Sequence, residues 1–345
     1  MRLFMEDIHE LVALIATVSG PRSPPRREPM SNRCAIVTGG AGFIGSHVVD
    51  ALLADDWRVV VIDDLSTGDA RRVADQATLE VADITDRGAL EKAIDAARPA
   101  AIFHLAAQSS VTRSVAEPER DCEINVRGTL NVLDGAGRHR TPVVFTSTGG
   151  ALYGDGAPLP TPEDSPPSPI SPYGASKWAA EAYVATWREA SGISHAICRL
   201  ANVYGPRQSP HGEAGVVALF SHALWCGAKP TLFGFGTPTR DYVHVQDVAR
   251  ALLTAVGHGG VFNVSTGVET PVSRVFELLR GAANSTVEGE LAQLRPGELT
   301  RSCIDPSRAR DQLGWRAEVG LEEGLVATYR ALVEEFELDN ARATG

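Results

Sequence analysis

Two side chains with complementary acid–base chemistry stand four residues apart, as Tyr173 and Lys177 in the segment Tyr-Gly-Ala-Ser-Lys. On a helix, this spacing places the phenol and the ammonium on one face. A free tyrosine has a pKa near 10, so accepting a proton near neutral pH needs a shift of about 3 units, roughly 4 kcal/mol. A lysine charge and a positively charged nicotinamide ring could together supply that shift. An isolated Tyr/Lys pair with this spacing is more often an ordinary exposed pair than a catalytic one, so other motifs in the chain must distinguish the two.

A glycine-rich turn lies upstream, in residues 38–45 (TGGAGFIG). It follows the apolar run 34–37 and precedes a helix-like stretch, which indicates a strand, a turn and a helix start. Gly39 would permit the tight turn, Gly42 would let the backbone approach a pyrophosphate, and Gly45 would let helix and strand pack closely. The free N–H groups of the helix start suit phosphates. The segment therefore predicts a dinucleotide site.

An acidic residue, Asp63, ends the next apolar run, 58–62. It follows the glycines by about 20 residues, as a carboxylate that binds a ribose requires. The segment Asp64 to Gly68 after it contains no arginine that could neutralise a ribose 2′-phosphate. The sequence therefore favours NAD over NADP as the cofactor.

Apolar runs alternate with longer helical patterns from residue 33 onward, which predicts an α/β fold with a doubly wound, parallel Rossmann sheet. Ligands should bind at the carboxyl ends of its strands. The runs expected to form strands are 34–38, 58–63, 79–82, 100–105, 142–147 and 195–200.

Three parts are expected along the chain. Residues 1–30 form an N-terminal extension with a proline- and arginine-rich linker, residues 31–201 an NAD-binding Rossmann domain, and residues 202–345 a smaller C-terminal substrate-binding region that partly returns to the Rossmann domain. Loops rich in glycine and proline and shorter helices are expected in this last part. The extension is interpreted as a peripheral helix or a start-codon artefact, since Met30 precedes the first strand; a helix for a partner or a membrane surface is the alternative.

Composition excludes several classes of partner. A formal net charge of -11 and a pI near 5.3 argue against nucleic acid and anionic membranes. No apolar run approaches the roughly 20 residues of a membrane-spanning helix. The five cysteines are scattered, without a C-x-x-C pair, so neither a disulfide framework nor a metal site is indicated. A cytoplasmic protein is expected, with local arginines if its substrate is an anion.

These motifs together resemble the extended short-chain dehydrogenases/reductases, and within that family the NAD-dependent nucleotide-sugar epimerases, of which UDP-glucose 4-epimerase is typical. The resemblance runs from about Cys34 to about Arg330. Besides the glycine turn and the Tyr/Lys pair, it rests on the segments 104–108 (HLAAQ), 124–129 (INVRGT) and 145–154 (FTSTGGALYG).

The resemblance implies how NAD would be held. Asp83 and Ile84 would lie by the adenine, residues 104–108 would line the cofactor, and Asn125 would support the cofactor side of the site. The residues expected to contact NAD are Gly39, Gly42, Phe43, Ile44, Gly45, Asp63, Asp64, Leu65, Ser66, Thr67, Gly68, Asp83, Ile84, Leu105, Ala106, Ala107, Gln108, Asn125, Tyr173 and Lys177.

The resemblance also assigns the catalytic groups. Thr148 would hydrogen-bond the 4-hydroxyl of the sugar, Tyr173 would remove its proton, and Lys177 would tune the tyrosine. Ser147 is a second candidate for the hydroxyl, because many members are one residue shorter between this position and the tyrosine. The alternative to a catalytic role is that Thr148 only forms hydrogen bonds with backbone groups at the end of its strand.

Two glycines separate reactions that begin identically. Nucleotide-sugar 4,6-dehydratases carry Asp-Glu after the threonine, as the acid and base that eliminate water, whereas this chain has Gly149 and Gly150. Glycine can act neither as this acid nor as this base, so a 4-keto sugar would not lose water and would instead be reduced again, from either face.

The positively charged and apolar side chains that would bind the nucleotide lie in the second half of the chain. By resemblance, Asn202, Arg240 and Arg295 would hold the diphosphate, where guanidinium groups suit bidentate contacts. Glu298 would accept a hydrogen bond from a ribose hydroxyl. The residues expected to bind the substrate are Thr148, Asn202, Val216, Thr231, Phe233, Arg240, Arg295 and Glu298.

The expected activity is NAD-dependent epimerisation at C4 of a nucleotide-diphosphate sugar, with UDP-glucose and UDP-galactose first. Alternatives are an epimerase of UDP-glucuronate, a UDP-N-acetylhexosamine or a dTDP-sugar, or a related dehydratase or reductase. A non-catalytic dinucleotide sensor would have no reason to keep Tyr173, Lys177 and the arginines. A homodimer is expected by resemblance, through a four-helix bundle built from helices near 115–137 and 173–190.

Overall fold

The computed structural model describes residues 33–211, 215–295 and 298–344. The expected helix and linker of residues 1–30 lie outside the described residues. Within the described ranges, no helix is both long enough and apolar enough to span a lipid bilayer.

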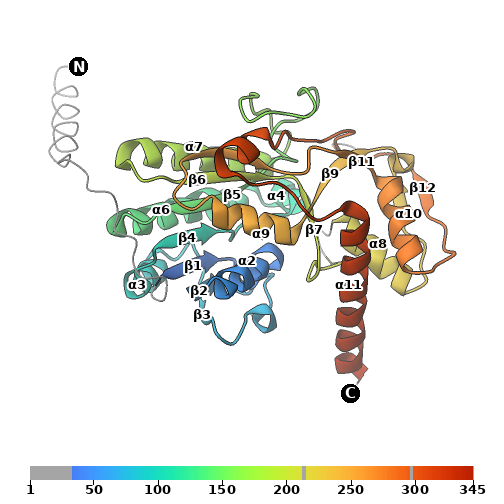
Figure 1. The fold of residues 1–345 in the computed structure, drawn as a ribbon, viewed down its shortest axis with the longest axis horizontal. Coiled ribbons are helices and arrows are strands. Elements are labelled where there is room, and N and C mark those ends of the chain that lie inside the picture. Colours follow the sequence, from blue (N-terminus) through green and yellow to red (C-terminus); the bar gives the residue numbers. More distant parts are fainter. Residues whose placement is uncertain (1–32, 212–214, 296–297, 345) are drawn as a thin grey trace.

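A parallel sheet of seven strands forms the centre of the molecule, in the order β10-β6-β5-β4-β1-β2-β3 (Figure 1). The chain runs outward from β1 to β3 and then from β4 in the other direction, so β1 and β4 flank a topological switch point where ligands bind. The strands are β1 (Cys34–Thr38), β2 (Arg58–Asp63), β3 (Thr78–Val81), β4 (Ala101–His104), β5 (Val143–Thr148), β6 (Ala196–Leu200) and β10 (Gly260–Val264). This confirms the doubly wound sheet and its six expected strands; β10 was not expected.

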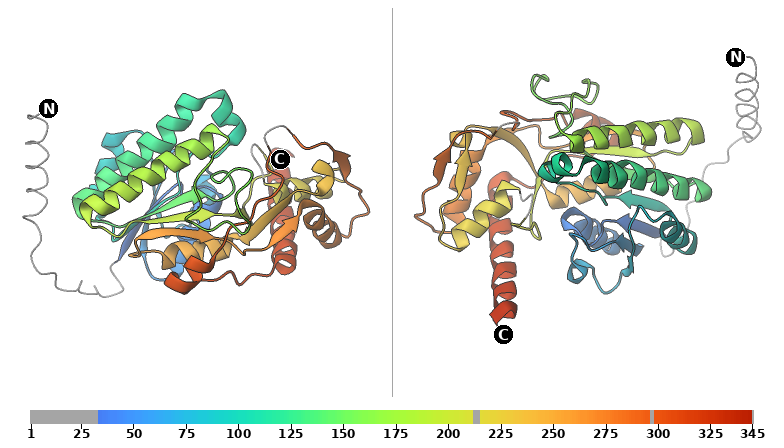
Figure 2. Two further views of the ribbon diagram at one scale, coloured as in Figure 1. Left: turned by 90° about the horizontal axis from the view of Figure 1, so that it is seen from above. Right: turned by 180° about the vertical axis from the view of Figure 1, so that it is seen from behind.

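Helices cover both faces of the sheet (Figure 2). One face carries α2 (Phe43–Ala54), α9 (Val245–Thr254) and the short helix η5 (Ala309–Leu313); the other carries α3 (Arg87–Ala97), α6 (Gly128–His139) and α7 (Pro172–Ser191). Burial on both faces explains why the strands are continuous apolar runs.

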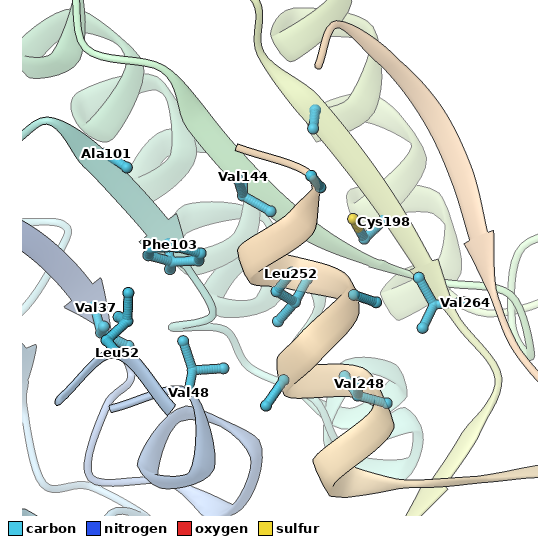
Figure 3. Packing of buried hydrophobic residues seen from close by; sticks show 14 of the residues in the cluster. Val37, Val48, Leu52, Ala101, Phe103, Val144, Cys198, Val248, Leu252 and Val264 are labelled. Atoms are coloured by element: carbon cyan, nitrogen blue, oxygen red, sulfur yellow. The ribbon is translucent and has the colours of Figure 1, made fainter. Parts of the chain in front are cut away.

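The two apolar cores use alternate residues of the same strands. Val37 packs with α2 and α9, whereas its neighbour Ile36 packs with α3, α6 and α7. In Figure 3, Val248 and Leu252 of α9 lie among the strand residues Val144 and Cys198. The helix α9 comes from the second half of the chain and completes the layer begun by α2.

A smaller region stands at one end of the sheet (Figure 1). It contains a three-stranded sheet β11-β9-β7 and a two-stranded sheet β12-β8. Its elements are β7 (Asn202–Tyr204), α8 (Val216–Trp225), β8 (Thr231–Phe233), β9 (Thr239–His244), β11 (Glu269–Pro271), α10 (Val272–Ala282), β12 (Glu290–Ala292) and α11 (Leu321–Thr344).

Two features of this second half differ from the sequence pattern or refine it. The expectation of shorter helices is wrong for α11, which has 24 residues and packs its apolar positions against α8 and α10. Both α9 and β10 lie on the main sheet although they follow residue 202. The domain division at residue 201 stays a prediction.

Candidate active site

The glycine turn joins β1 directly to α2. Gly39 adopts a left-handed φ of +72°, and a Cβ on Gly45 would lie 2.0 Å from the Gly39 carbonyl oxygen. Gly42 caps the helix without a side-chain hydrogen bond, and the first turn contains no acid. The leading N–H groups of α2 are therefore available to an anion, as the pyrophosphate of NAD requires.

Asp63 ends β2 and is 7% exposed. Its two carboxylate oxygens accept hydrogen bonds from the backbone N–H groups of Ala41 (3.0 Å) and Leu65 (2.9 Å). Burial raises the pKa of Asp63. The carboxylate thus ties the glycine turn to the loop Asp64 to Gly68, and each oxygen keeps a lone pair for a ribose hydroxyl.

The remaining expected NAD residues follow neighbouring strands. Asp83 and Ile84 come after β3, and the segment 105–108 comes after β4. A Cβ on Gly39 would lie 2.6 Å from the Ala106 nitrogen, so the turn and the end of β4 touch. The structure therefore gathers the expected NAD residues along one edge of the sheet; their contacts with NAD stay predictions.

His104, the first residue of the segment 104–108, is buried at the end of β4. Its Nε2 lies 3.0 Å from the Thr129 hydroxyl, which donates to the Asn125 carbonyl (2.6 Å). Nε2 therefore carries the proton, and Nδ1 accepts from the Thr38 hydroxyl at 2.7 Å. Burial, with a smaller effect of Lys177, lowers the pKa of His104 to about 3. A neutral imidazole thus links β1 to the helix of Asn125.

The catalytic helix α7 starts against the end of β5. Ser171 caps it by accepting from the Gly174 N–H (3.2 Å), with Pro172 at the first helical position. A Cβ on Gly174 would lie 2.4 Å from the Ala151 carbonyl oxygen, so glycine is needed for this approach. The approach brings Tyr173 to Thr148, whose hydroxyl hydrogen-bonds the phenol.

The two hydroxyl candidates of β5 differ in their contacts. Thr148 Oγ1 accepts from the Ala151 N–H at 3.1 Å and is hydrogen-bonded to Tyr173. Ser147 Oγ is buried without a hydrogen-bond partner among the described residues. The geometry favours Thr148 as the hydroxyl that works with Tyr173.

Burial dominates the pKa values of the Tyr/Lys pair. Burial and then Asp121 raise the pKa of Tyr173 to about 12, while the hydrogen bond with Thr148 opposes them. Burial lowers the pKa of Lys177 to about 8, against the effects of Glu181 and Asp121. The Lys177 ammonium lies 4.4 Å from the Phe145 ring centroid. Lys177 is not among the protein groups that shift the pKa of Tyr173, and the combined effect expected from Lys177 and a nicotinamide ring stays a prediction.

Asn125 lies in a π-helical turn, η3 (Glu123–Arg127), between α5 (Pro118–Cys122) and α6. Such turns are frequent at functional sites. The Asn125 amide donates to Ser176 Oγ on α7 at 3.0 Å, so it holds the helix that carries Tyr173 and Lys177. The short helix α4 (Val111–Ala116) packs beside it against α7.

A buried ion pair that the sequence analysis missed anchors α7 to β6. Arg199 and Glu181 meet at 2.6 Å, with side chains 6% and 5% exposed. Arg199 also donates to the Tyr153 hydroxyl (2.6 Å) and the Glu163 carbonyl (2.9 Å). Nothing in residue type or spacing marks this pair, because its members lie on different elements.

The expected substrate residues meet at one pocket of about 210 Å³ in the smaller region. A Cβ on Gly150 would lie 3.8 Å from the Asn202 side-chain oxygen, so the pocket adjoins the end of β5. Thr148 lies at β5 rather than in the pocket lining. The expected residues that line the pocket are Asn202, Val216, Thr231, Phe233, Arg240, Arg295 and Glu298.

The cations of the pocket are positioned by different partners. The Arg295 guanidinium lies 4.2 Å from the Phe233 ring centroid and 2.7 Å from Glu298. Arg240 donates to the Thr239 carbonyl at 2.9 Å. Both keep further N–H donors, so the pocket offers two guanidinium groups to an anion beside an aromatic ring.

Two of the pocket residues that had not been assigned from sequence carry buried polar atoms. Gln208 Oε1 and the Tyr242 hydroxyl are buried without hydrogen-bond partners among the described residues, and both side chains line the pocket. Their only sequence signal is that they stand in the same segments as Asn202 and Arg240. Among the described residues, no cluster of His, Cys, Asp and Glu is suited to hold a metal ion.

Comparisons with known proteins agree with this geometry. The model of the family described as NAD dependent epimerase/dehydratase matches residues 35–265. The chain is 46% identical over 302 residues to the UDP-glucose 4-epimerase of Mycolicibacterium smegmatis, covering 85% of this chain and 96% of that protein.

Two solved structures are similar over most of the chain. The UDP-glucose 4-epimerase of Thermotoga maritima with UDP-glucose has a TM-score of 0.86 at 42% identity, covering 88% of this chain and 99% of that one. The UDP-glucose 4-epimerase of Thermus thermophilus in complex with NAD has a TM-score of 0.81 at 41% identity, covering 87% and 98%.

Proposed function

The chain belongs to the NAD-dependent epimerase/dehydratase family, and on that premise we propose that it interconverts UDP-glucose and UDP-galactose by inverting C4 of the sugar. The observation that carries this proposal is the hydrogen-bonded pair of Thr148 and Tyr173 beside the buried Lys177. The pair adjoins a pocket that contains two arginines and an aromatic ring.

NAD is the cofactor of this family, and when bound it supplies the hydride acceptor that oxidises the C4 alcohol and the donor that reduces the resulting ketone. Tyr173 accepts the proton of the 4-hydroxyl and returns it to the product. Thr148, hydrogen-bonded to that phenol, orients the hydroxyl. Lys177 lies one helical turn further along and contributes positive charge to the same site.

The nucleotide end supplies binding energy at a distance from the reacting carbon. Arg240 and Arg295 contact the diphosphate, and Phe233 packs against the base side of the nucleotide. An anchor at the diphosphate lets the sugar turn about its bond while the ketone is retained. The buried acceptor Gln208 Oε1 and the Tyr242 hydroxyl are available to polar groups of the same ligand.

Packing at Gly149 supports epimerisation over elimination of water. A Cβ at this position would lie 2.5 Å from Ile304 Cδ1 and 3.3 Å from the Leu200 carbonyl oxygen. The space after Thr148 is therefore filled by an apolar side chain, and an acidic residue at this position would require Ile304 to move. The site lacks the acid that a dehydratase uses at this position.

The test is turnover of a panel of nucleotide sugars, with products identified by NMR. The panel contains UDP-galactose, UDP-glucuronate, UDP-N-acetylglucosamine and a dTDP-hexose, each with added NAD. We expect UDP-galactose to give UDP-glucose with no net NADH absorbance. Accumulation of NADH in proportion to product would identify a dehydrogenase, and preference for another sugar would reassign the substrate.

A second copy of the chain is proposed as the partner. Large apolar side chains are exposed on α4 and α7, where Val115 is 65% and Trp178 45% exposed. Val111 and Tyr183 add to this face. Light scattering coupled to gel filtration should give a dimer, and Trp178→Glu should shift it toward monomer. A monomer for the unchanged protein at micromolar concentration would contradict the proposal.

A further inference from the structure

A buried carboxylate lies under the catalytic helix without an assigned role. Asp121, near the end of α5, is 1% exposed. Its Oδ1 accepts hydrogen bonds from Gln108 Nε2 (2.8 Å) and Asn125 Nδ2 (3.1 Å). Its Oδ2 is buried and accepts no hydrogen bond from the described residues. A buried carboxylate with an unused oxygen is costly unless a positive charge balances it.

The hydrogen bonds of Asp121 lead to the catalytic helix in two steps. Asn125 exchanges hydrogen bonds with the Gln108 backbone, its Oδ1 accepting from N and its Nδ2 donating to O, both at 2.9 Å. The same Nδ2 lies 3.0 Å from Ser176 Oγ and 3.1 Å from Asp121 Oδ1, so these two oxygens share the second proton of the amide, and Ser176 Oγ donates to the Tyr173 carbonyl at 3.0 Å. Asp121 thereby fixes the amide that holds the turn of α7 between Tyr173 and Lys177.

Two buried carboxylates act on Lys177. The residue is 3% exposed, and Glu181 and, after it, Asp121 raise the pKa of Lys177 against the effect of burial. Its ammonium lies 4.4 Å from the Phe145 ring centroid, and the imidazole of His104, which interacts with it, is neutral. Glu181 is already neutralised by the buried Arg199. The described hydrogen bonds of Asp121 come from amides, which leave its charge intact.

Tyr173 faces the same carboxylate. Asp121 raises the pKa of Tyr173 after burial does, and the Thr148 hydroxyl lowers it. Asp121 also raises the pKa of Lys177, against the larger effect of burial. One buried charge therefore acts on both groups in the same direction, toward the protonated form.

Resting on the proposed function, we propose that Asp121 is a positioning residue of this site, whose buried carboxylate fixes the Asn125–Ser176 support of α7 and keeps the Lys177 ammonium charged. Its charge thereby sets the pH range in which Tyr173 and Lys177 work together. The effect passes through Lys177 and Asn125, and Asp121 itself touches no reacting atom.

Asp121→Asn tests the charge with little change of shape, because the amide oxygen can still accept from Gln108 and Asn125. The chain has three lysines, Lys92, Lys177 and Lys229, so ¹³C-lysine labelling gives a simple NMR spectrum. We expect the titration midpoint of Lys177, about 8 in the unchanged protein, to move to lower pH in Asp121→Asn. The exposed Lys92 and Lys229 serve as internal references, and Asp121→Glu should restore the midpoint.

The second readout is the pH profile of turnover with UDP-galactose. Removing the carboxylate favours ionised Tyr173 and neutral Lys177, so both limbs of the profile should move to lower pH. Asp134→Asn, on the exposed face of α6, is the matched control and should leave both limbs in place. An unmoved Lys177 midpoint with unmoved limbs, whatever the loss in kcat, would overturn the proposal in favour of a merely structural role.

Ser176→Ala separates the two parts of the proposal. It cuts the hydrogen bond from Asn125 to α7 but keeps the Asp121 charge, so kcat should fall while the Lys177 midpoint stays. Should Asp121→Asn not fold, Asp121→Ser repeats the titration with a hydroxyl acceptor, and the same outcomes decide. The NMR titration needs no substrate, so absence of turnover in the unchanged protein would refute the proposed function while still testing Asp121.

Discussion

The two ends of the site are built differently. The catalytic end uses strand ends of the seven-stranded sheet and the 20-residue helix α7, and Lys177, Asn125 and Asp121 are almost fully buried there. The nucleotide end uses loops, the three-residue strands β7 and β8 and the six-residue strand β9, and the side chain of Arg295 is 59% exposed. Chemistry at C4 needs reacting groups held within fractions of an ångström, so it depends on rigid elements. Binding of a diphosphate depends on charge and number of donors, which half-exposed arginines provide.

Of the substitutions considered, Tyr173→Phe should cause the largest loss of kcat. A smaller loss than that of the other variants would contradict the assignment of the catalytic end. Loss of the phenol removes the group that accepts the proton, so kcat should fall about a thousandfold. UDP binding measured by calorimetry should stay unchanged, because the nucleotide contacts lie in the other region. Turnover close to that of the unchanged protein would contradict the assignment.

Thr148→Ala and Ser147→Ala together test which hydroxyl of the catalytic end works with Tyr173. Thr148→Ala removes the hydroxyl that is hydrogen-bonded to Tyr173 and should lower kcat about 10- to 100-fold. Ser147→Ala should leave kcat nearly unchanged, since Ser147 Oγ has no described hydrogen-bond partner. Steady-state kinetics of both variants compare the candidates directly, and the reverse order of effects would move the role to Ser147.

Arg240→Ala tests the nucleotide end. Loss of a charge-assisted hydrogen bond to a phosphate should raise KM about tenfold and leave kcat within a few-fold, because the contact is the same in ground and transition states. Arg310→Ala removes an exposed arginine paired with Asp311 and is the charge control. A fall in kcat without a change in KM would place Arg240 in the chemistry.

Acid pH should destabilise the folded chain partly through His104. The pKa of His104 is about 3 in the folded chain and near 6.5 when unfolded, so the unfolded state binds more protons between these values. The free energy of unfolding should therefore fall as pH drops below about 6.5, by at most about 1.4 kcal/mol per pH unit from this residue.

Urea unfolding of the unchanged protein and of His104→Gln, at neutral pH and at a pH between 4 and 6, measures this effect. Glutamine can donate and accept as the imidazole does but binds no proton, so the variant should lose less stability in acid. His258→Gln, at an exposed position, is the control. Equal acid sensitivity of His104→Gln and the unchanged protein would mean that His104 is not the source.

The main sheet was predictable because burial on both faces makes each strand a continuous apolar run. Strand β10 was not predicted from the sequence, because it is flanked by glycines and follows an irregular stretch. The segments of Asn202, Arg240 and Arg295 were recognised by resemblance, but tertiary structure brings them to one pocket, from β7, from β9 and from the loop after β12. Roles of the site residues stay predictions until the variants are measured.

The sequence by itself determined the alternation of strands and helices, the glycine turn before α2 and the spacing of Tyr173 and Lys177, because these follow from local conformation and period. Tertiary structure alone decided that α5, which carries Asp121, packs against α7, and that Arg199 neutralises Glu181. It also decided that Thr148, rather than Ser147, meets Tyr173. These pairs join different elements, and the balance between burial and charge that governs them exists only once the elements have packed.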